Sequence, residues 1–251
     1  MRPAIRPITT PERTTAHWSR AGVLFGTPPA RRSPDPERLL LDTARHAPAH
    51  PRLFNHAVSW LAHYSNFVAR HRLKRLALTE LDADTRPALG LLLDLAIRHG
   101  AARDLRFAAN ACDHHASPRP LFDIHQTSES RRRLAESAAC PEGRARGLWA
   151  PDPGVAPDAL RPADWILKHN PTYRERAVRK GDLRTSILES LRNDAPDGTL
   201  GSEKKLAELV AANRAAVTAS LDDLALEGVQ LRRPDPSDRR RTQIALPTAA
   251  W

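Results

Sequence analysis

Apolar positions recur at helical spacing in the C-terminal region of the chain. Leu183, Ile187 and Leu191 follow one another at four-residue intervals, which predicts a helix with one apolar face. Two further helices are expected, one after Ser202 and one after Asn213, because both residues are good N-caps and are followed by spaced apolar residues. The predicted helices cover residues 183–191, 203–209 and 214–227.

The pattern changes to short alternating runs after Gly228, a residue type that favours a helix C-terminus. Residues 229–233 and 242–246 alternate between apolar and polar positions, which predicts a two-stranded hairpin. The hairpin carries five arginines against two aspartates. A short helix, a turn, a longer helix and a basic hairpin together predict a winged helix-turn-helix, which places a helix in the major groove of DNA and a wing on its backbone.

Several of these stretches resemble known bacterial regulators. Residues 200–207 (LGSEKKLA), 213–217 (NRAAV) and 226–229 (LEGV) are similar to the helix-turn-helix of GntR-type regulators. Residues 232–240 (RRPDPSDRR) resemble the wing of MarR-type regulators. The resemblance covers the C-terminal region alone and implies a bacterial transcription factor that binds duplex DNA by sequence. It departs from the GntR pattern at Thr218, where those proteins usually carry a second basic residue.

The expected DNA contacts fall into three groups. The first turn of the second helix is expected to hold a phosphate through its backbone N–H groups. The start of the third helix is expected to face base edges, with Arg214 as the reader of guanine, and the wing arginines are expected to meet the backbone or minor groove. The predicted DNA-binding residues are Ser202, Lys204, Lys205, Asn213, Arg214, Ala215, Thr218, Arg233, Arg239, Arg240 and Arg241.

The N-terminal half also follows a helical pattern. Leucine-rich and aromatic runs joined by short polar turns predict a bundle or stacked helical hairpins. Pro51 suits the first position of the longest of these helices. The expected helices cover residues 37–46, 51–68, 84–99 and 101–112, with shorter pieces near 128–139 and 174–180. The predicted fold class is therefore mainly α, with a helical N-terminal domain and a C-terminal winged helix-turn-helix.

Four segments are expected along the chain. Residues 1–36, rich in proline and arginine, are predicted to be an extended arm with a short ordered piece around residues 18–25. The arm is either a flexible tail or a segment that lies along DNA. Residues 37–148 form the helical domain, and residues 149–180 form a linker or bridging segment whose large apolar side chains favour packing against a domain. Residues 181–251 form the winged helix-turn-helix domain.

The charge balance points to an anionic partner. The net charge is +10 and the pI is near 10.6. From Lys180 onward eleven Lys and Arg residues balance eleven Asp and Glu residues, so the excess lies in residues 1–179. Nucleic acid is the usual partner of such a basic protein. On charge alone, RNA or a membrane surface would fit as well as DNA.

No catalytic motif stands out. The chain lacks GxxxxGK[ST], GxGxxG and GxSxG patterns, so neither an enzyme activity nor a cofactor is expected. Cys112, His114, His115, His125 and Cys140 are metal-type ligands, but their spacing matches no zinc template, and no metal is expected. The absence of a secretory or membrane-spanning pattern leads us to expect a cytoplasmic, nucleoid-associated protein without a membrane partner.

The sequence thus predicts a sequence-specific regulator that binds double-stranded DNA as a homodimer. It is expected to repress transcription, including that of its own gene. The sequence does not indicate whether a small molecule acts as an effector, or which one. The alternative is a protein-interaction module, such as an antitoxin or a subunit of a defence or nucleoprotein complex, which would use the winged helix for docking or for non-specific DNA binding. A nuclease would require an acidic or metal-ligand cluster, and the sequence offers none.

Overall fold

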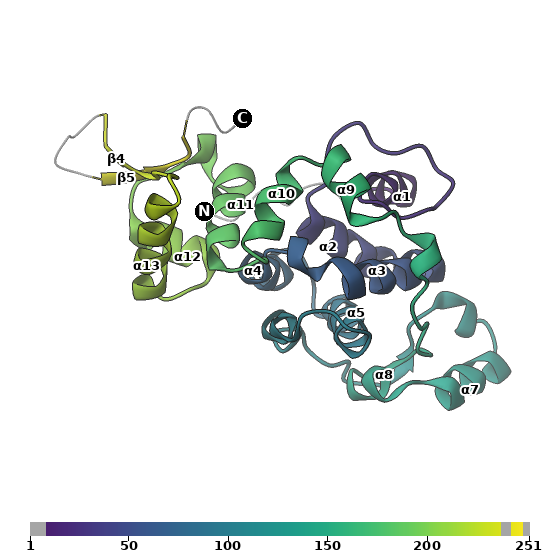
Figure 1. The fold of residues 1–251 in the computed structure, drawn as a ribbon. Helices are drawn as coiled ribbons and strands as arrows, with labels where there is room; N and C mark the ends of the chain where they lie inside the picture. Colours follow the sequence, from purple (N-terminus) through teal and green to yellow (C-terminus); the bar gives the residue numbers. More distant parts are fainter. Residues whose placement is uncertain (1–8, 237–241, 248–251) are drawn as a thin grey trace.

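The structure is a computed structural model that describes residues 9–236 and 242–247. Over these residues the chain is mainly helical and carries two small sheets, so the prediction of a mainly α protein is confirmed. Figure 1 shows a large helical body and, attached at one side, a smaller unit that combines helices with a sheet. None of the described helices combines the length and the apolar character needed to cross a lipid bilayer.

The large body comprises ten α-helices over residues 9–180. Proline stands in the first turn of several of them, where its fixed φ fits and its missing N–H is not needed. Thr10 and Asp35 cap the first two helices with side-chain oxygens. The helices are α1 (Pro11–Arg20), α2 (Pro36–His46), α3 (Pro51–Tyr64), α4 (Arg70–Glu80), α5 (Arg86–Arg98), α6 (Arg106–Ala109), α7 (Glu129–Ala138), α8 (Pro141–Ala145), α9 (Ala163–His169) and α10 (Thr172–Val178). Two short parallel strands, β1 (Arg119–Pro120) and β2 (Leu148–Trp149), pair beside them.

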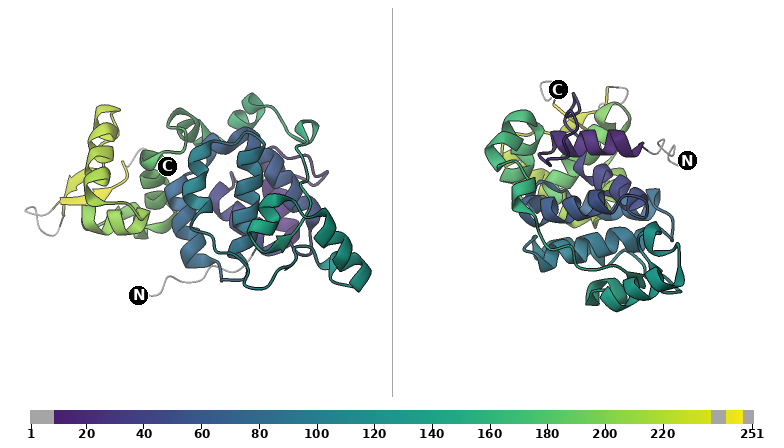
Figure 2. Two further views of the ribbon diagram at one scale, coloured as in Figure 1. Left: turned by 90° about the horizontal axis from the view of Figure 1, so that it is seen from below. Right: turned by 90° about the vertical axis from the view of Figure 1, so that its right-hand side faces the viewer.

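The core of this body lies around α3 and α5, which pack against each other and against α2. Trp60, Leu89 and Leu92 are fully buried there. Figure 2 shows the helices stacked in layers, with α1 at one end and α7 and α8 at the other. Burial of apolar faces on consecutive helices is therefore the main force that holds this body together.

The prediction of an extended arm over residues 1–36 is wrong for residues 11–20, and the ordered piece expected around residues 18–25 begins earlier in the chain. Residues 11–20 form α1, and Trp18 is fully buried against the edge of Trp60 with a centroid distance of 5.2 Å. The Trp18 Nε1–H donates to Thr43 Oγ1 at 2.9 Å, so the indole loses no hydrogen bond on burial. The proline and arginine content of the segment favoured an extended arm over a helix. The helix packs through Trp18 against Trp60, which lies 42 residues away in the sequence, so the local pattern does not indicate this contact.

The helix predicted over residues 101–112 is also shorter than expected. A 3₁₀ turn (Arg103–Leu105) precedes α6, which ends at Ala109. The buried Arg146 donates to the carbonyl oxygens of Ala109 at 3.0 Å and Cys112 at 2.5 Å. This distant guanidinium satisfies carbonyls that a longer helix would have used internally. The sequence pattern also did not predict α4 as a separate helix.

Residues 149–180 pack closely on the large body. Ile166 of α9 and Tyr173 of α10 are fully buried in its core. The Tyr173 hydroxyl donates to the carbonyl of Pro34 at 3.1 Å. These contacts agree with the expectation that the large apolar residues of this segment pack against a domain.

The smaller unit contains α11 (Leu183–Asp194), α12 (Glu203–Val210) and α13 (Arg214–Leu226). Its sheet has the order β3-β5-β4, with β3 (Thr199–Leu200), β4 (Arg232–Pro234) and β5 (Thr242–Ala245) all antiparallel. The register pairs Ile244 with both Leu200 and Arg232. Ile187, Leu206, Leu221 and Ile244 belong to a core of its own. The third strand, β3, was not expected, because two residues between helices carry no alternation signal.

Buried ion pairs join the two bodies, and α11 packs against α4. Asp194, at the end of α11, accepts from Arg38 at 2.9 Å and from the fully buried Arg72 at 2.8 Å. Arg176 of α10 donates to Glu37 at 2.7 Å and to Glu189 of α11 at 2.5 Å. Helix α11 thus continues past its predicted end, because Asp194 is held in place by arginines of the large body.

Candidate nucleic-acid interface

The predicted site residues lie on two helices joined by a tight turn. Ser202 Oγ accepts from the backbone N–H of Lys205 at 3.3 Å and caps α12. Ala211 adopts a left-handed conformation with φ of 52° and ends that helix. Asn213 Oδ1 then accepts from the N–H of Ala216 at 2.7 Å and caps α13. Local capping therefore accounts for the residues at which α12 and α13 begin and for the turn between them.

The start of α13 is open to solvent. Asn213, Arg214 and Ala215 are all exposed, and Val217 and Leu221 on the opposite face are buried in the core of the unit. Lys204 and Lys205 on α12 are exposed as well. Figures 1 and 2 show α13 and the β4–β5 hairpin at the end of the unit that faces away from the large body. This end is thus accessible to a large partner.

Glu203 lies at the centre of this face and connects three elements. Its Oε2 accepts from the hydroxyl of Thr218 on α13 at 2.8 Å, and its Oε1 accepts from Arg232 Nε on β4 at 2.8 Å. Partial burial alone would raise the pKa of Glu203, but the hydrogen bonds from Arg232 and Thr218 and the charge of Arg214 outweigh it and lower that pKa. Glu203 is therefore an anion placed inside the predicted DNA-binding face.

The position of Thr218 differs from the expected one. Its side chain is half-buried toward α12, and its Oγ1 also lies 3.0 Å from the carbonyl oxygen of Arg214. The hydroxyl proton is thus directed to acceptors inside the protein. A base edge at this position would have to compete with Glu203. Nothing in the local sequence pattern around Glu203 indicates a link to residues 15 and 29 positions away.

The described part of the hairpin carries paired arginines. Arg232 donates to Glu203 and also pairs with Asp222 of α13. Arg233 on β4 is half-buried. Arg239, Arg240 and Arg241, the other predicted wing contacts, lie outside the described residues. Arg232 was not among the predicted contacts, and the structure gives it the role of linking the hairpin to both helices.

Acidic residues gather toward the far end of α13. Asp222 and Asp223 are exposed, while Glu227 accepts from Arg179 at 2.8 Å and from Arg184 at 2.6 Å. Because Glu227 is turned toward α10 and α11, its charge is partly neutralised away from the start of α13. The positive end of the face consequently lies at the N-termini of α12 and α13, where helix dipoles add to it.

The cysteine and histidine residues noted in the sequence do not form a metal site in the described part of the chain. Within residues 9–236 and 242–247 no group of three or more His, Cys, Asp or Glu side chains is arranged to hold a metal ion. Cys112 and Cys140 are buried free thiols, and burial raises the pKa of Cys112 to about 11. Such a thiol is a poor nucleophile at neutral pH.

Comparisons with known proteins give no independent assignment. No family model, no curated protein and no solved structure matches the chain.

Proposed function

We propose that residues 181–251 form a winged helix-turn-helix and that the protein is a sequence-specific regulator that binds double-stranded DNA. The proposal is supported by the succession of three helices and an antiparallel sheet with one core. In such domains the second helix of the pair enters the major groove and a hairpin contacts the neighbouring backbone. Helix α13 and the β4–β5 hairpin correspond to those two elements.

The observation that carries the proposal is the exposed start of α13. Arg214 stands in the first turn of a helix whose opposite face is buried in the core of its unit, and Asn213 precedes it as the N-cap. Arginine donates a pair of hydrogen bonds to guanine O6 and N7, and asparagine can make two to adenine. Arg214 is assigned as the principal reader, with Asn213 and Ala215 beside it.

Phosphate contacts are assigned to the neighbouring elements. Lys204 and Lys205 are exposed in the first turn of α12, next to the backbone N–H groups that follow Ser202. Helix N-termini bind phosphates because unpaired N–H groups and the dipole both favour an anion. Arg233 is assigned to the backbone, and the sequence adds Arg239, Arg240 and Arg241 to the wing.

The test is a DNA-binding measurement on the full chain. A target is selected from random duplexes, and affinities for that target are compared between the parent, Arg214→Ala and Arg133→Ala. Loss of a base-reading arginine costs about 1 to 3 kcal/mol. Arg133 is a 77% exposed arginine on α7 and serves as the matched control. If Arg214→Ala binds as tightly as the parent, α13 is not the reader.

We propose further that binding represses transcription by occluding a promoter, and that a homodimer reads two half-sites. Two-fold dimers are the usual means by which one short recognition helix gains specificity. A footprint of two half-sites upstream of the protein's own gene, separated by one or more helical turns, would support both parts. This role needs no catalytic activity and places the protein in the cytoplasm with the nucleoid.

A protein-docking role is the second candidate, and the apolar surface beside the acidic end of α13 favours it. Leu226 is 89% exposed at the end of that helix, and Val178 at the end of α10 is 79% exposed. Each of these residues directly precedes one member of the Arg179–Glu227 pair, which links the end of α10 to the end of α13. A stoichiometric partner lost from the Leu226→Ser variant, together with no selected DNA target, would favour this role over the regulator.

A further inference from the structure

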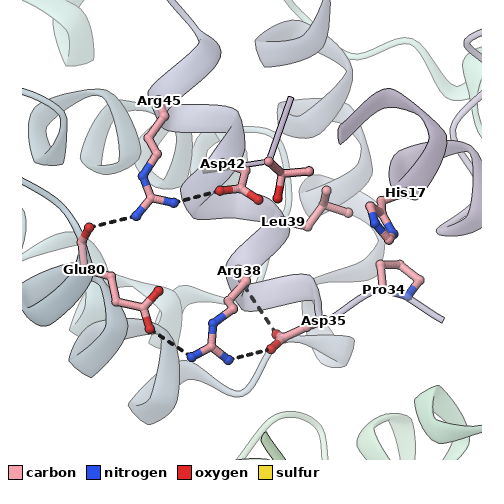
Figure 3. Close-up of a pocket in the computed structure, with 9 residues that line it drawn as sticks. His17, Pro34, Asp35, Arg38, Leu39, Asp42, Arg45 and Glu80 are labelled. Carbon is pink, nitrogen blue, oxygen red and sulfur yellow. Dashed lines mark hydrogen bonds and ion pairs between the residues drawn. The ribbon is translucent and has the colours of Figure 1, made fainter. Parts of the chain in front are cut away.

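A pocket of about 200 Å³ opens beside α2, between α1 and α4. Figure 3 shows the charged side chains that surround it. An engineered cavity of roughly 150 Å³ holds a benzene molecule, so this pocket has room for a ligand of about eight non-hydrogen atoms. The side chains that decide its chemistry are His17, Asp35, Arg38, Asp42, Arg45 and Glu80.

The two arginines of the pocket are already engaged with protein acceptors. Arg45 donates to Asp42 Oδ1 and to the carbonyl oxygen of Glu80, each at 2.7 Å. Arg38 donates to Glu80 Oε1 at 2.9 Å, to Asp35 Oδ2 at 3.2 Å and to Asp194 Oδ1 at 2.9 Å. An incoming anion would therefore find the terminal nitrogens of both guanidinium groups engaged. The Nε–H of Arg38 has no partner in the described chain, but it is buried.

Open acceptors remain on the carboxylates. Among the described residues no hydrogen bond reaches the second oxygens of Asp42 and Glu80, Oδ2 and Oε2. The pocket lining carries three carboxylates against two guanidinium groups. Asp35 is also paired with Arg72 behind the lining, so the open negative charge is that of Asp42 and Glu80. His17 adds little positive charge near neutral pH, because burial and the charge of Arg13 lower its pKa despite the opposing effect of Asp42. Its Nδ1 is buried and has no partner within the described chain. The chemistry favours a cation.

The same pocket is connected to the C-terminal unit. Arg38 lines the pocket with one part of its guanidinium and holds Asp194, the last residue of α11, with another. A cationic ligand at Glu80 Oε2 shares the charge of that carboxylate with Arg38, which is bonded to Oε1, and so weakens the Arg38–Glu80 pair. Arg38 then depends more strongly on its remaining partners Asp35 and Asp194, which tightens the end of α11.

We propose that this pocket binds a small molecule with an ammonium or guanidinium group, and that its occupancy is transmitted to α11 through the Arg38–Asp194 pair. A change in DNA affinity on ligand binding rests on the function proposed above. Ligand binding itself and its effect on α11 do not rest on it. The pocket thereby becomes an effector site that lies in the large body and acts on the smaller unit.

Ligand binding is tested by isothermal titration calorimetry on the full chain. Agmatine and n-butylamine are the cationic probes, and 1-butanol and butyrate are neutral and anionic controls of similar length. We expect both cations to bind at one site and neither control to bind. Asp42→Asn and Glu80→Gln should each weaken agmatine binding about 10-fold or more, as when a charge-assisted hydrogen bond is lost. Glu136→Gln, an exposed position on α7, should leave it unchanged.

Transmission is tested by hydrogen exchange of the backbone amides of residues 183–194 with and without agmatine. We expect slower exchange at the end of α11 in the parent. Asp194→Asn lies outside the pocket lining, so this variant should bind agmatine yet show no change in exchange. Absence of binding, equal binding of butyrate, or full affinity in both carboxylate variants would overturn the site, and an unchanged exchange pattern in the parent would overturn the coupling.

The failure of the regulator proposal would be visible separately. If no DNA target is selected but agmatine binds and protects α11, the pocket and its coupling stand while the DNA-binding role falls. If DNA binds and agmatine does not, the pocket proposal alone is lost.

Discussion

The guanidinium of Arg72 on α4 holds the carboxylate of Asp194 on α11 with two hydrogen bonds, Nε to Oδ2 at 2.8 Å and Nη2 to Oδ1 at 3.0 Å. Arg72 is fully buried, and Asp194 has a side chain only 5% exposed. This pair crosses the junction between the large body and the C-terminal unit. A buried ion pair contributes little net stability compared with an apolar pair of the same size, but removal of one partner leaves a charge uncompensated. The junction is therefore sensitive to single substitutions.

Asp194→Asn should lower the free energy of unfolding by about 3 kcal/mol, because Arg38, Arg72 and Arg75 lose a shared counter-charge in a buried position. Urea denaturation followed by circular dichroism measures the change. Asp197→Asn is the matched control, since Asp197 is exposed three residues further along the chain and asparagine tolerates its positive φ of 50°. Equal losses in the two variants would contradict a special role for the junction.

The contribution of Asp194 to stability should depend on pH. Burial alone would raise the pKa of this carboxyl, but hydrogen bonds and charge from Arg72, with the charges of Arg75 and Arg38, hold it below its ordinary value of 3.8. A depressed pKa in the folded state gives stability that is complete above that ordinary value and is lost as the pH falls toward the folded-state pKa. The advantage of the parent over Asp194→Asn should thus be constant at neutral pH and shrink below about pH 4. An advantage that is the same at pH 7 and pH 3 would refute this.

Gly181→Ala should destabilise the protein far more than Gly154→Ala. Both glycines have a positive φ, 66° and 64°, so each substitution incurs a backbone cost of about 1 to 2 kcal/mol. A Cβ at Gly181 would in addition lie 2.0 Å from the carbonyl oxygen of Val68, whereas a Cβ at Gly154 meets no atom within 4 Å. We expect a loss of about 3 kcal/mol or more at Gly181, measured by urea denaturation. Similar losses at both positions would show that the chain relaxes around residue 181 without cost.

Glu203→Gln should strengthen binding to duplexes of any sequence. The substitution removes an anion from the face formed by α12, α13 and β4, and it weakens the hold on Arg232. If Arg232 gains one phosphate contact, the plot of log affinity against log salt concentration should steepen by about 0.9. Fluorescence anisotropy with a random duplex at several salt concentrations gives that slope. Glu208→Gln, at an exposed position of the same helix, controls for the loss of one charge. An equal effect of both variants would rule out a specific role for Glu203.

Local signals in the chain determined the helices of the C-terminal unit and the residues at which α12 and α13 begin. Ser202 and Asn213 are capping residues whose side chains bond to amides three positions ahead, and this short reach makes their role visible in the sequence. The spacing of Val217, Leu221 and Leu224 likewise specified the buried face of α13. The exposed start of α13 follows from these local facts alone.

Tertiary structure decided which charges are free. Glu203, Thr218 and Arg232 are ordinary surface residues in the sequence, and their mutual hydrogen bonds arise only when α12, α13 and β4 pack together. The junction follows the same rule, because Arg72 and Asp194 are separated by 122 positions. Sequence periodicity reports which face of an element is apolar, but it carries no information on which distant polar group will meet another.

The sequence by itself thus fixed a mainly helical chain, the helix caps, Asn213 among them, and the placement of Arg214 in the first turn of a helix. Only the folded structure revealed that residues 11–20 form a docked helix, that Asp194 is held by three arginines, and that a charged pocket lies against the same arginine network. The physical reason is distance along the chain: capping and helical spacing act over a few residues, whereas burial and ion pairing depend on neighbours that folding brings together.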